Sequence, residues 1–206
     1  METAMQPERS ARMRVARRIT DVFAPPPLAV IALLAVAWRT SHSAGDTIRW
    51  AAAGAIFASL LPFLYLLRKV RRGEVTDRNV RVRVQRPPVI LAFLAGGLAA
   101  LVVLARFGAS REMLAMVGAG VVSSVVALGI TFFWKISIHT GVVAGLVTVF
   151  TLVFGPGAAV LMPLVPLVGW ARVELRDHTV SQVIGGAFVG AVVSGSTYVV
   201  ILTLLQ

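Results

Sequence analysis

The sequence has no cysteine and little charge. Of its 206 residues, 14% are Asp, Glu, Lys or Arg, whereas soluble domains are about one-quarter charged. The lack of cysteine excludes a disulfide framework and a thiolate metal site. Acidic residues are especially scarce, because nine Asp and Glu stand against 20 Lys and Arg and the net charge is +11. An ordinary soluble domain does not have this composition.

Apolar residues make up 57% of the chain and gather in long uncharged runs. These runs cover residues 22–38, 50–67, 87–105, 113–134, 140–171 and 179–206. A bilayer core of about 30 Å needs about 20 apolar residues as a helix, and backbone groups in lipid must be hydrogen-bonded internally. The fifth run is too long for one crossing and is divided at residues 155–157, which read Gly-Pro-Gly. The sequence therefore predicts an all-α, polytopic transmembrane helical bundle with six to seven membrane helices.

The chain is predicted to have two unequal parts. Residues 1–21 form an Arg-rich N-terminal segment that is cytoplasmic or interfacial, and residues 22–206 form one transmembrane domain. No clear small-residue cleavage site follows the basic cluster, so we interpret it as a retained segment and not as a signal peptide.

Two local patterns predict how the membrane helices are shaped and packed. Pro62 is expected to kink the second helix, because proline has no amide hydrogen to donate. Small residues four positions apart allow two helices to approach closely. The pairs with this spacing are Gly141/Gly145 and Gly186/Gly190.

Basic residues are distributed unevenly between the loops that alternate along the chain. Sixteen of the 20 Lys and Arg fall in the N-terminal segment and in loops 68–86, 135–139 and 171–178. The other four, Arg39, Arg49, Arg106 and Arg111, fall in the alternate loops. By the positive-inside rule the first set is cytoplasmic, which predicts a multi-pass protein of the plasma (inner) membrane. No nucleic-acid partner is expected, because binding one requires a continuous soluble basic face.

Polar side chains able to do chemistry collect on the predicted cytoplasmic face, in three segments. They are Asp77, Arg78, Asn79, Arg83 and Arg86, then Lys135, Ser137 and His139, then Arg172, His178 and Gln182. Arginine forks bind phosphate oxygens in bidentate geometry. Two histidines can share the roles of nucleophile and general acid near neutral pH. We therefore expect phosphoryl chemistry on a lipid headgroup.

The first of these segments fits either an interfacial strand or a helix, since residues 80–84 read Val-Arg-Val-Arg-Val. In a helix, Asn79, Arg83 and Arg86 would share one face. Arg78 and Arg81 would then lie elsewhere and be solvated.

Together the three segments resemble the signature of the type 2 phosphatidic acid phosphatase (PAP2) superfamily of membrane lipid phosphatases. That signature reads Lys-x6-Arg-Pro, then Pro-Ser-Gly-His, then Ser-Arg-x5-His-x3-Asp. The matching residues are Arg86 and Pro87, then Ser137 and His139, then Arg172 and His178. The resemblance spans about residues 73–190, with the motifs in the family's order and each at a predicted helix end.

The sequence also departs from this signature at several positions. Asn79 replaces the first lysine, Ala171 replaces the serine, and Ile136 and Ile138 flank Ser137. Gln182 replaces the aspartate that orients the nucleophilic histidine. Its carbonyl can accept a hydrogen bond but carries no charge, and Glu174 or Asp177 could serve instead. The sequence His-Thr-x-x-Gln-Val is similar to the third motif of dolichyl-diphosphate phosphatases in the same superfamily.

The resemblance implies a metal-independent hydrolase of lipid phosphomonoesters or diphosphates that needs no cofactor. His178 would attack phosphorus to form a phosphohistidine, with Gln182 beside it, and His139 would protonate the departing oxygen. The phosphoryl oxygens would be held by Arg83, Arg86, Lys135, Ser137 and Arg172, and Arg78, Asn79 and Asp77 are further candidates. The expected partners are a lipid phosphate substrate and membrane lipids. Phosphatidate, phosphatidylglycerophosphate and polyprenyl phosphates or diphosphates are the candidate substrates.

Two other functions are open from the sequence. One is a non-catalytic protein that binds or transports lipid phosphates through a degenerate PAP2-like site. The other is a metal site made of His139, His178 and either Asp177 or Glu174, a ligand set that suits several metals. The surrounding arginines would repel a cation, which ranks the metal site last.

Overall fold

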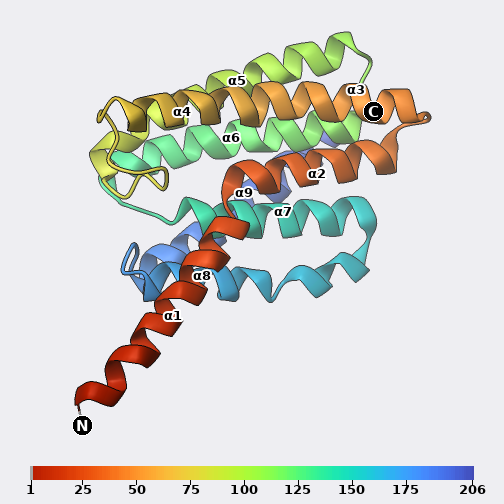
Figure 1. The fold of residues 1–206 in the computed structure, drawn as a ribbon. Helices are drawn as coiled ribbons and strands as arrows, with labels where there is room; N and C mark the ends of the chain where they lie inside the picture. The colour runs from red at the N-terminus through yellow and green to blue at the C-terminus, as the bar shows by residue number, and fades with distance from the viewer. Residues whose placement is uncertain (1) are drawn as a thin grey trace.

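The computed structural model describes the backbone of residues 2–206 and the side chains of residues 11–206, and this part of the chain is helical without strands. Its α-helices are α1 (Glu2–Val22), α2 (Pro25–Thr40), α3 (Ala44–Gly54), α4 (Leu61–Arg71), α5 (Arg86–Arg106), α6 (Arg111–Phe133), α7 (Ile138–Phe154), α8 (Leu164–Glu174) and α9 (Val180–Leu204). Shorter helical turns are η1 (Ala55–Leu60), η2 (Arg83–Gln85) and η3 (Pro156–Leu161). Helices α2 to α9 form an elongated bundle, and α1 runs obliquely across one end (Figure 1).

The helices confirm a polytopic membrane bundle. Within the described residues, five helical stretches are long and apolar enough to cross a membrane: Ala44–Arg71, Arg83–Arg106, Arg111–Phe133, Pro156–Glu174 and Val180–Leu204. A sixth is formed if Ala11–Val22 and α2, which meet at a 44° bend, are one broken span. Helix α7 is also apolar but shorter, and it packs against α9, α8 and α2. The structure therefore supports five to six spans by length and composition, where the sequence predicted six to seven helices.

The predicted second helix is longer than expected and accommodates its proline without breaking. Helices α3 and α4 are joined by η1, a π-helical turn that ends two residues before Pro62. In a π turn the hydrogen bonds join residues five apart. This change of partners just before Pro62 accommodates the amide hydrogen that proline lacks. Residues 44–71 consequently form one span.

Close packing between α7 and α9 confirms the prediction made from the spaced glycines. A Cβ atom on Gly190 would lie 2.0 Å from the carbonyl oxygen of Gly141, and one on Gly186 would lie 2.4 Å from that of Ser137. Only glycine permits backbones to approach this closely. The amide of Ser137 also donates to the carbonyl of Gln182 at 3.0 Å, so the second and third motif segments are held together.

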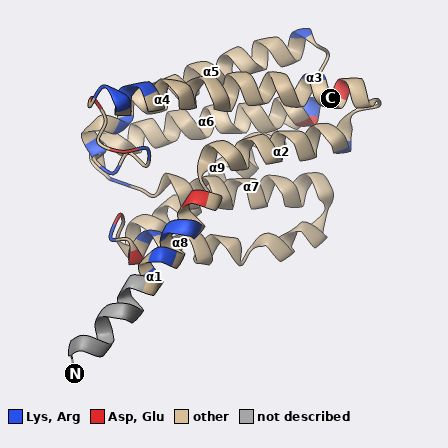
Figure 2. Ribbon diagram, viewed as in Figure 1, with Lys and Arg blue, Asp and Glu red and all other residues tan. Residues whose placement is uncertain are grey.

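The bundle has a strongly charged end and a weakly charged end (Figure 2). The loops after α4, α6 and α8 meet at the first, as the sequence grouping predicted. Helix α1 lies at this end and packs against α8, with Ala16 and Thr20 buried. The N-terminal segment is therefore helical, although the side chains of residues 1–10, including Arg9, lie outside the described part.

Helix α2 begins with three consecutive prolines beside the bend. Pro25, Pro26 and Pro27 occupy its first turn, and the amide of Leu28 bonds to the carbonyl of Ala24 at 3.2 Å. Proline fits a first turn because the amide hydrogens there have no helical partner.

Candidate active site

His178 is fixed in one orientation by the start of α9. Thr179 is the N-cap of this helix and forms a capping box with Gln182. The side-chain oxygen Oε1 of Gln182 accepts the backbone N–H of Thr179 at 3.3 Å and lies 3.0 Å from Nδ1 of His178. Because Oε1 is an acceptor, Nδ1 of His178 must carry its hydrogen. The lone pair of the neutral imidazole is therefore on Nε2.

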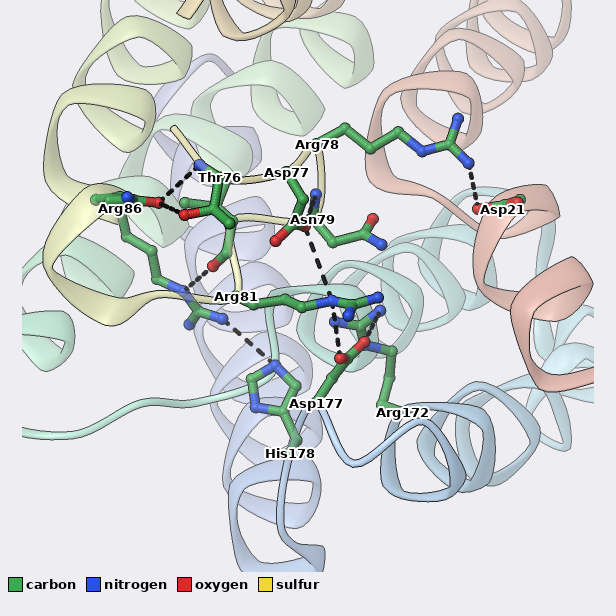
Figure 3. A network of polar contacts seen from close by, with 12 residues as sticks. Asp21, Thr76, Asp77, Arg78, Asn79, Arg81, Arg86, Arg172, Asp177 and His178 are labelled. Carbon is green, nitrogen blue, oxygen red and sulfur yellow. Dashed lines mark hydrogen bonds and ion pairs between the residues drawn. The ribbon is translucent and has the colours of Figure 1, made fainter. Parts of the chain in front are cut away.

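That lone pair faces a cation. Nη2 of Arg86 lies 3.4 Å from Nε2 of His178, and a dashed line joins the two residues in Figure 3. Burial, with further contributions from Arg86, Arg172 and Lys135, lowers the pKa of His178 to about 3. At neutral pH the imidazole is consequently uncharged, which is the form that can act as a nucleophile.

Arg86 connects all three motif segments. Its guanidinium is buried and donates to the carbonyl of Val80 at 3.0 Å through Nε and to that of Ile136 at 2.7 Å through Nη1. Val80 has a positive φ of 46°, a conformation uncommon for a β-branched residue. This turn presents its carbonyl to Arg86, whose remaining nitrogen, Nη2, faces His178.

Arg172 is a second buried guanidinium, with essentially no exposed surface in the last turn of α8. Nη1 of Arg172 lies 2.9 Å from Oδ2 of Asp177, and Oδ1 of Asp177 lies 2.9 Å from Nε of Arg81 (Figure 3). The contact with Arg172 is an ion pair by distance but lacks hydrogen-bond alignment, so Nε and Nη1 of Arg172 have no hydrogen-bond acceptor among the described residues. These donors are available to an anion.

His139 and Ser137 lie at the start of α7. Ser137 is the N-cap and accepts the amide of Thr140. His139 is buried, and its Nε2 has no hydrogen-bond partner among the described residues. Its ring is within electrostatic range of Arg172 and His178. The two histidines that the sequence singled out therefore belong to one site.

Lys135 contributes a further positive charge beside this site. Its Nζ donates to the backbone carbonyl of Asp177 at 2.7 Å. Partial burial, followed by the neighbouring Arg86, lowers the pKa of Lys135.

Several candidate residues make contacts away from the two histidines. Arg83 donates to the carbonyls of Thr131 and Phe132 at the end of α6, at 3.1 and 2.7 Å. Arg78 pairs with Asp21 of α1 at 2.7 Å. Asp77 accepts the backbone amide of Asn79 at 2.8 Å and thereby shapes the loop.

Both alternatives for the first segment, the interfacial strand and the helix, are wrong up to residue 82. Residues 73–82 form a loop, and only Arg83–Gln85 turn helically before α5. The positive φ of Val80 interrupts any regular repeat. Arg81, which helical spacing placed away from the site, instead reaches Asp177. Its ion pair depends on two loop conformations that no spacing pattern encodes.

A cavity of about 580 Å³ in the apolar bundle borders this site at Arg86, Ser137 and His139, whereas His178 and Arg172 do not line it. At the charged end its lining includes Asp21, Arg78, Asn79, Arg86, Ser137 and His139. Farther in it is lined almost entirely by apolar side chains of α2, α5, α6, α7 and α9, as far as Val149. Val149 follows His139 by ten positions in α7, which corresponds to about 15 Å of helix. No residue of α8 lines this cavity.

Among the described residues, no three His, Asp or Glu side chains come together in a geometry that could hold a metal ion. Comparison of the chain with protein-family models, curated proteins and solved structures found no match in any of the three.

Proposed function

We propose that the protein is a PAP2-like integral membrane lipid phosphatase that hydrolyses a lipid phosphomonoester or diphosphate through a phosphohistidine on His178. The observation that carries the proposal is the orientation of this imidazole. Gln182 holds Nδ1, and Nε2, which carries the lone pair, lies beside Nη2 of Arg86. A residue that only binds phosphate has no need of an uncharged, oriented nitrogen lone pair.

The reaction would proceed in two displacements. Nε2 of His178 attacks phosphorus, the N–P bond forms, and the bond from phosphorus to the leaving oxygen breaks. His139, whose Nε2 has no hydrogen-bond partner among the described residues, gives a proton to that oxygen from its imidazolium form. It then takes a proton from water, whose oxygen attacks the phosphohistidine and releases phosphate and the free imidazole.

Charge stabilisation would come from the cations around His178. Arg86 and Arg172 are buried and Lys135 is partly buried, where electrostatic interactions with a phosphoryl group are stronger than in water. Fixed donors aimed at developing charge are worth about 10²–10³ in rate each. In this proposal Arg83 supports the end of α6, and Ser137 caps α7.

The cavity supports a lipid as the substrate. Its charged mouth suits a phosphate, and its apolar interior suits a hydrocarbon chain. A soluble phosphate ester would leave that interior empty. The excess of Lys and Arg at the site end supports a cytoplasmic active site in the plasma (inner) membrane.

The test is phosphate release by purified protein in detergent with EDTA present. The substrates are phosphatidate, phosphatidylglycerophosphate and polyprenyl mono- and diphosphates. We expect release from one class, and loss of that release in His178→Ala. His42→Ala is the matched control, because His42 lies in the loop after α2 at the other end of the bundle. Equal activity of His178→Ala and wild type would contradict the mechanism. Silence of folded wild-type protein on every substrate would favour a lipid-phosphate binding or transport protein.

A further inference from the structure

Asp177 is a buried carboxylate placed between two arginines. Its side chain is 3% exposed, and its two oxygens lie 2.9 Å from Arg172 and 2.9 Å from Arg81. The two cations differ in setting, because Arg172 is enclosed by the bundle whereas the side chain of Arg81 is 47% exposed on the loop above. Asp177 therefore connects the interior of the site with its surface.

The ion pair with Arg172 is incomplete. Asp177 is the one acidic side chain within ion-pair distance of Arg172 in the described part of the chain. Even so, Nε and Nη1 of Arg172 and Oδ2 of Asp177 all lack an aligned hydrogen-bond partner. A buried charge without a counter-charge is strongly destabilising. The carboxylate thus balances the charge of Arg172 without using its hydrogen-bonding capacity.

We propose that Asp177 is the internal counter-ion of the phosphate site and that the phosphate group of the ligand displaces it from Arg172. This inference rests on the proposed function, since it assumes that a phosphate enters beside His178. A phosphate carries more negative charge than a carboxylate, and its oxygens can accept hydrogen bonds from Nε and Nη1 of Arg172. Asp177 keeps a partner after displacement, because Arg81 holds its other oxygen.

Displacement has an energetic consequence for binding. Every phosphate that enters must compete with a carboxylate already beside Arg172, so affinity is lower than the cations alone would give. The same competition favours release of inorganic phosphate at the end of a cycle. Asp177 is therefore a positioning residue that sets how tightly product is held, rather than a group that touches the reacting atoms.

The test is the affinity of full-length protein in detergent for inorganic phosphate, measured by isothermal titration calorimetry. Asp177→Asn removes the competitor, and we expect phosphate to bind about tenfold more tightly, equivalent to about 1.4 kcal/mol. Glu174→Gln is the matched control, because Glu174 lies three residues away and makes no ion pair among the described side chains. It should bind phosphate as the wild type does.

A purely structural role for Asp177 gives the opposite sign. Disorder of Arg172 would weaken phosphate binding, so unchanged or weaker binding in folded Asp177→Asn would overturn the counter-ion role alone. Failure of phosphate to bind both wild type and Asp177→Asn would overturn the proposed function with it.

A second variant keeps the test decisive if Asp177→Asn does not fold. Arg81→Gln leaves Asp177 with Arg172 as its one cation, so phosphate should bind several-fold more weakly. Arg78→Gln removes the same charge from the same loop, but Arg78 pairs with Asp21 of α1. It should have the smaller effect, because Arg78 forms no ion pair with Asp177 among the described side chains. Equal effects of the two variants would contradict the proposal.

Discussion

Gln182 lies one helical turn after His178, and its Oε1 is 3.0 Å from the Nδ1 atom of that histidine. The same oxygen accepts the amide of Thr179, so the orientation of the glutamine amide is fixed by the backbone. An amide in this position selects the tautomer of His178 as a carboxylate would. It differs in that it adds no negative charge to stabilise an imidazolium.

Removing the Gln182 amide should reduce activity without abolishing it. Gln182→Ala frees the imidazole to rotate and to shift its hydrogen, and the loss of one such hydrogen bond to a group that becomes charged costs about 10- to 100-fold. The measurement is kcat on the substrate found active. Gln182→Glu keeps an acceptor of the same shape and should retain more activity than Gln182→Ala. If Gln182→Ala matched wild type, orientation by this residue would be refuted.

His178 should stay uncharged well below neutral pH. Because its pKa in the folded protein is about 3 and an unfolded histidine titrates near about 6.5, only the unfolded chain binds a proton at this site between those values. The free energy of unfolding therefore falls as pH is lowered through that window. Thermal unfolding in detergent from pH 7 to pH 4 should show this slope, and His178→Gln should reduce it.

NMR of protein labelled with ¹⁵N-histidine gives a direct check on the same group. The chain has three histidines, and the His178→Gln spectrum identifies the peaks of His178. A midpoint near pH 6.5 for these peaks would contradict the lowered pKa of His178.

Gly190→Ala should destabilise the fold, because its Cβ would lie 2.0 Å from the carbonyl oxygen of Gly141. Helices α7 and α9 must then separate, and overpacking of this kind costs about 1–3 kcal/mol. Gly129→Ala in α6 is the matched control, since nothing lies within 4 Å of the added atom. It should be neutral or slightly stabilising. Melting temperatures in detergent decide between these outcomes, and equal losses in both variants would contradict the packing argument.

Filling the cavity should discriminate between substrates by chain length. Val189 lines the cavity from α9, so Val189→Phe should raise KM for long-chain lipid phosphates while leaving short-chain analogues almost unaffected. Val192→Phe makes the same change on the same helix, at a side chain that is 49% exposed and does not line the cavity. A matching rise of KM in both variants, or for both chain lengths, would show that the cavity does not hold the chain.

Much of the fold could be predicted because each membrane span requires a long run of apolar, uncharged residues, which is visible in the sequence. The charge-free runs and the Gly-Pro-Gly break correspond to helices α2 to α9, and the spaced glycines correspond to a real contact. Loops are different, since residues 73–82 have no repeating pattern. The turn at Val80 sets where Arg81 and Arg83 lie. The partner of Arg81 is Asp177, which lies nearly a hundred residues later in the chain. Partners of this kind could not be predicted from the spacing of residues in the loop. The number of spans is five or six, according to whether Ala11–Val22 and α2, which meet at a 44° bend, count as one broken span. Uncharged runs do not encode such a bend.

The proline start of α2 has a consequence for the wall of the cavity. A helix that begins inside hydrocarbon normally exposes amide hydrogens that nothing there can accept. At Pro25, Pro26 and Pro27 those hydrogens do not exist, and the next amide, of Leu28, is bonded to Ala24. All three prolines line the cavity. This part of the cavity wall therefore presents no free amide hydrogen to a hydrocarbon chain inside the cavity.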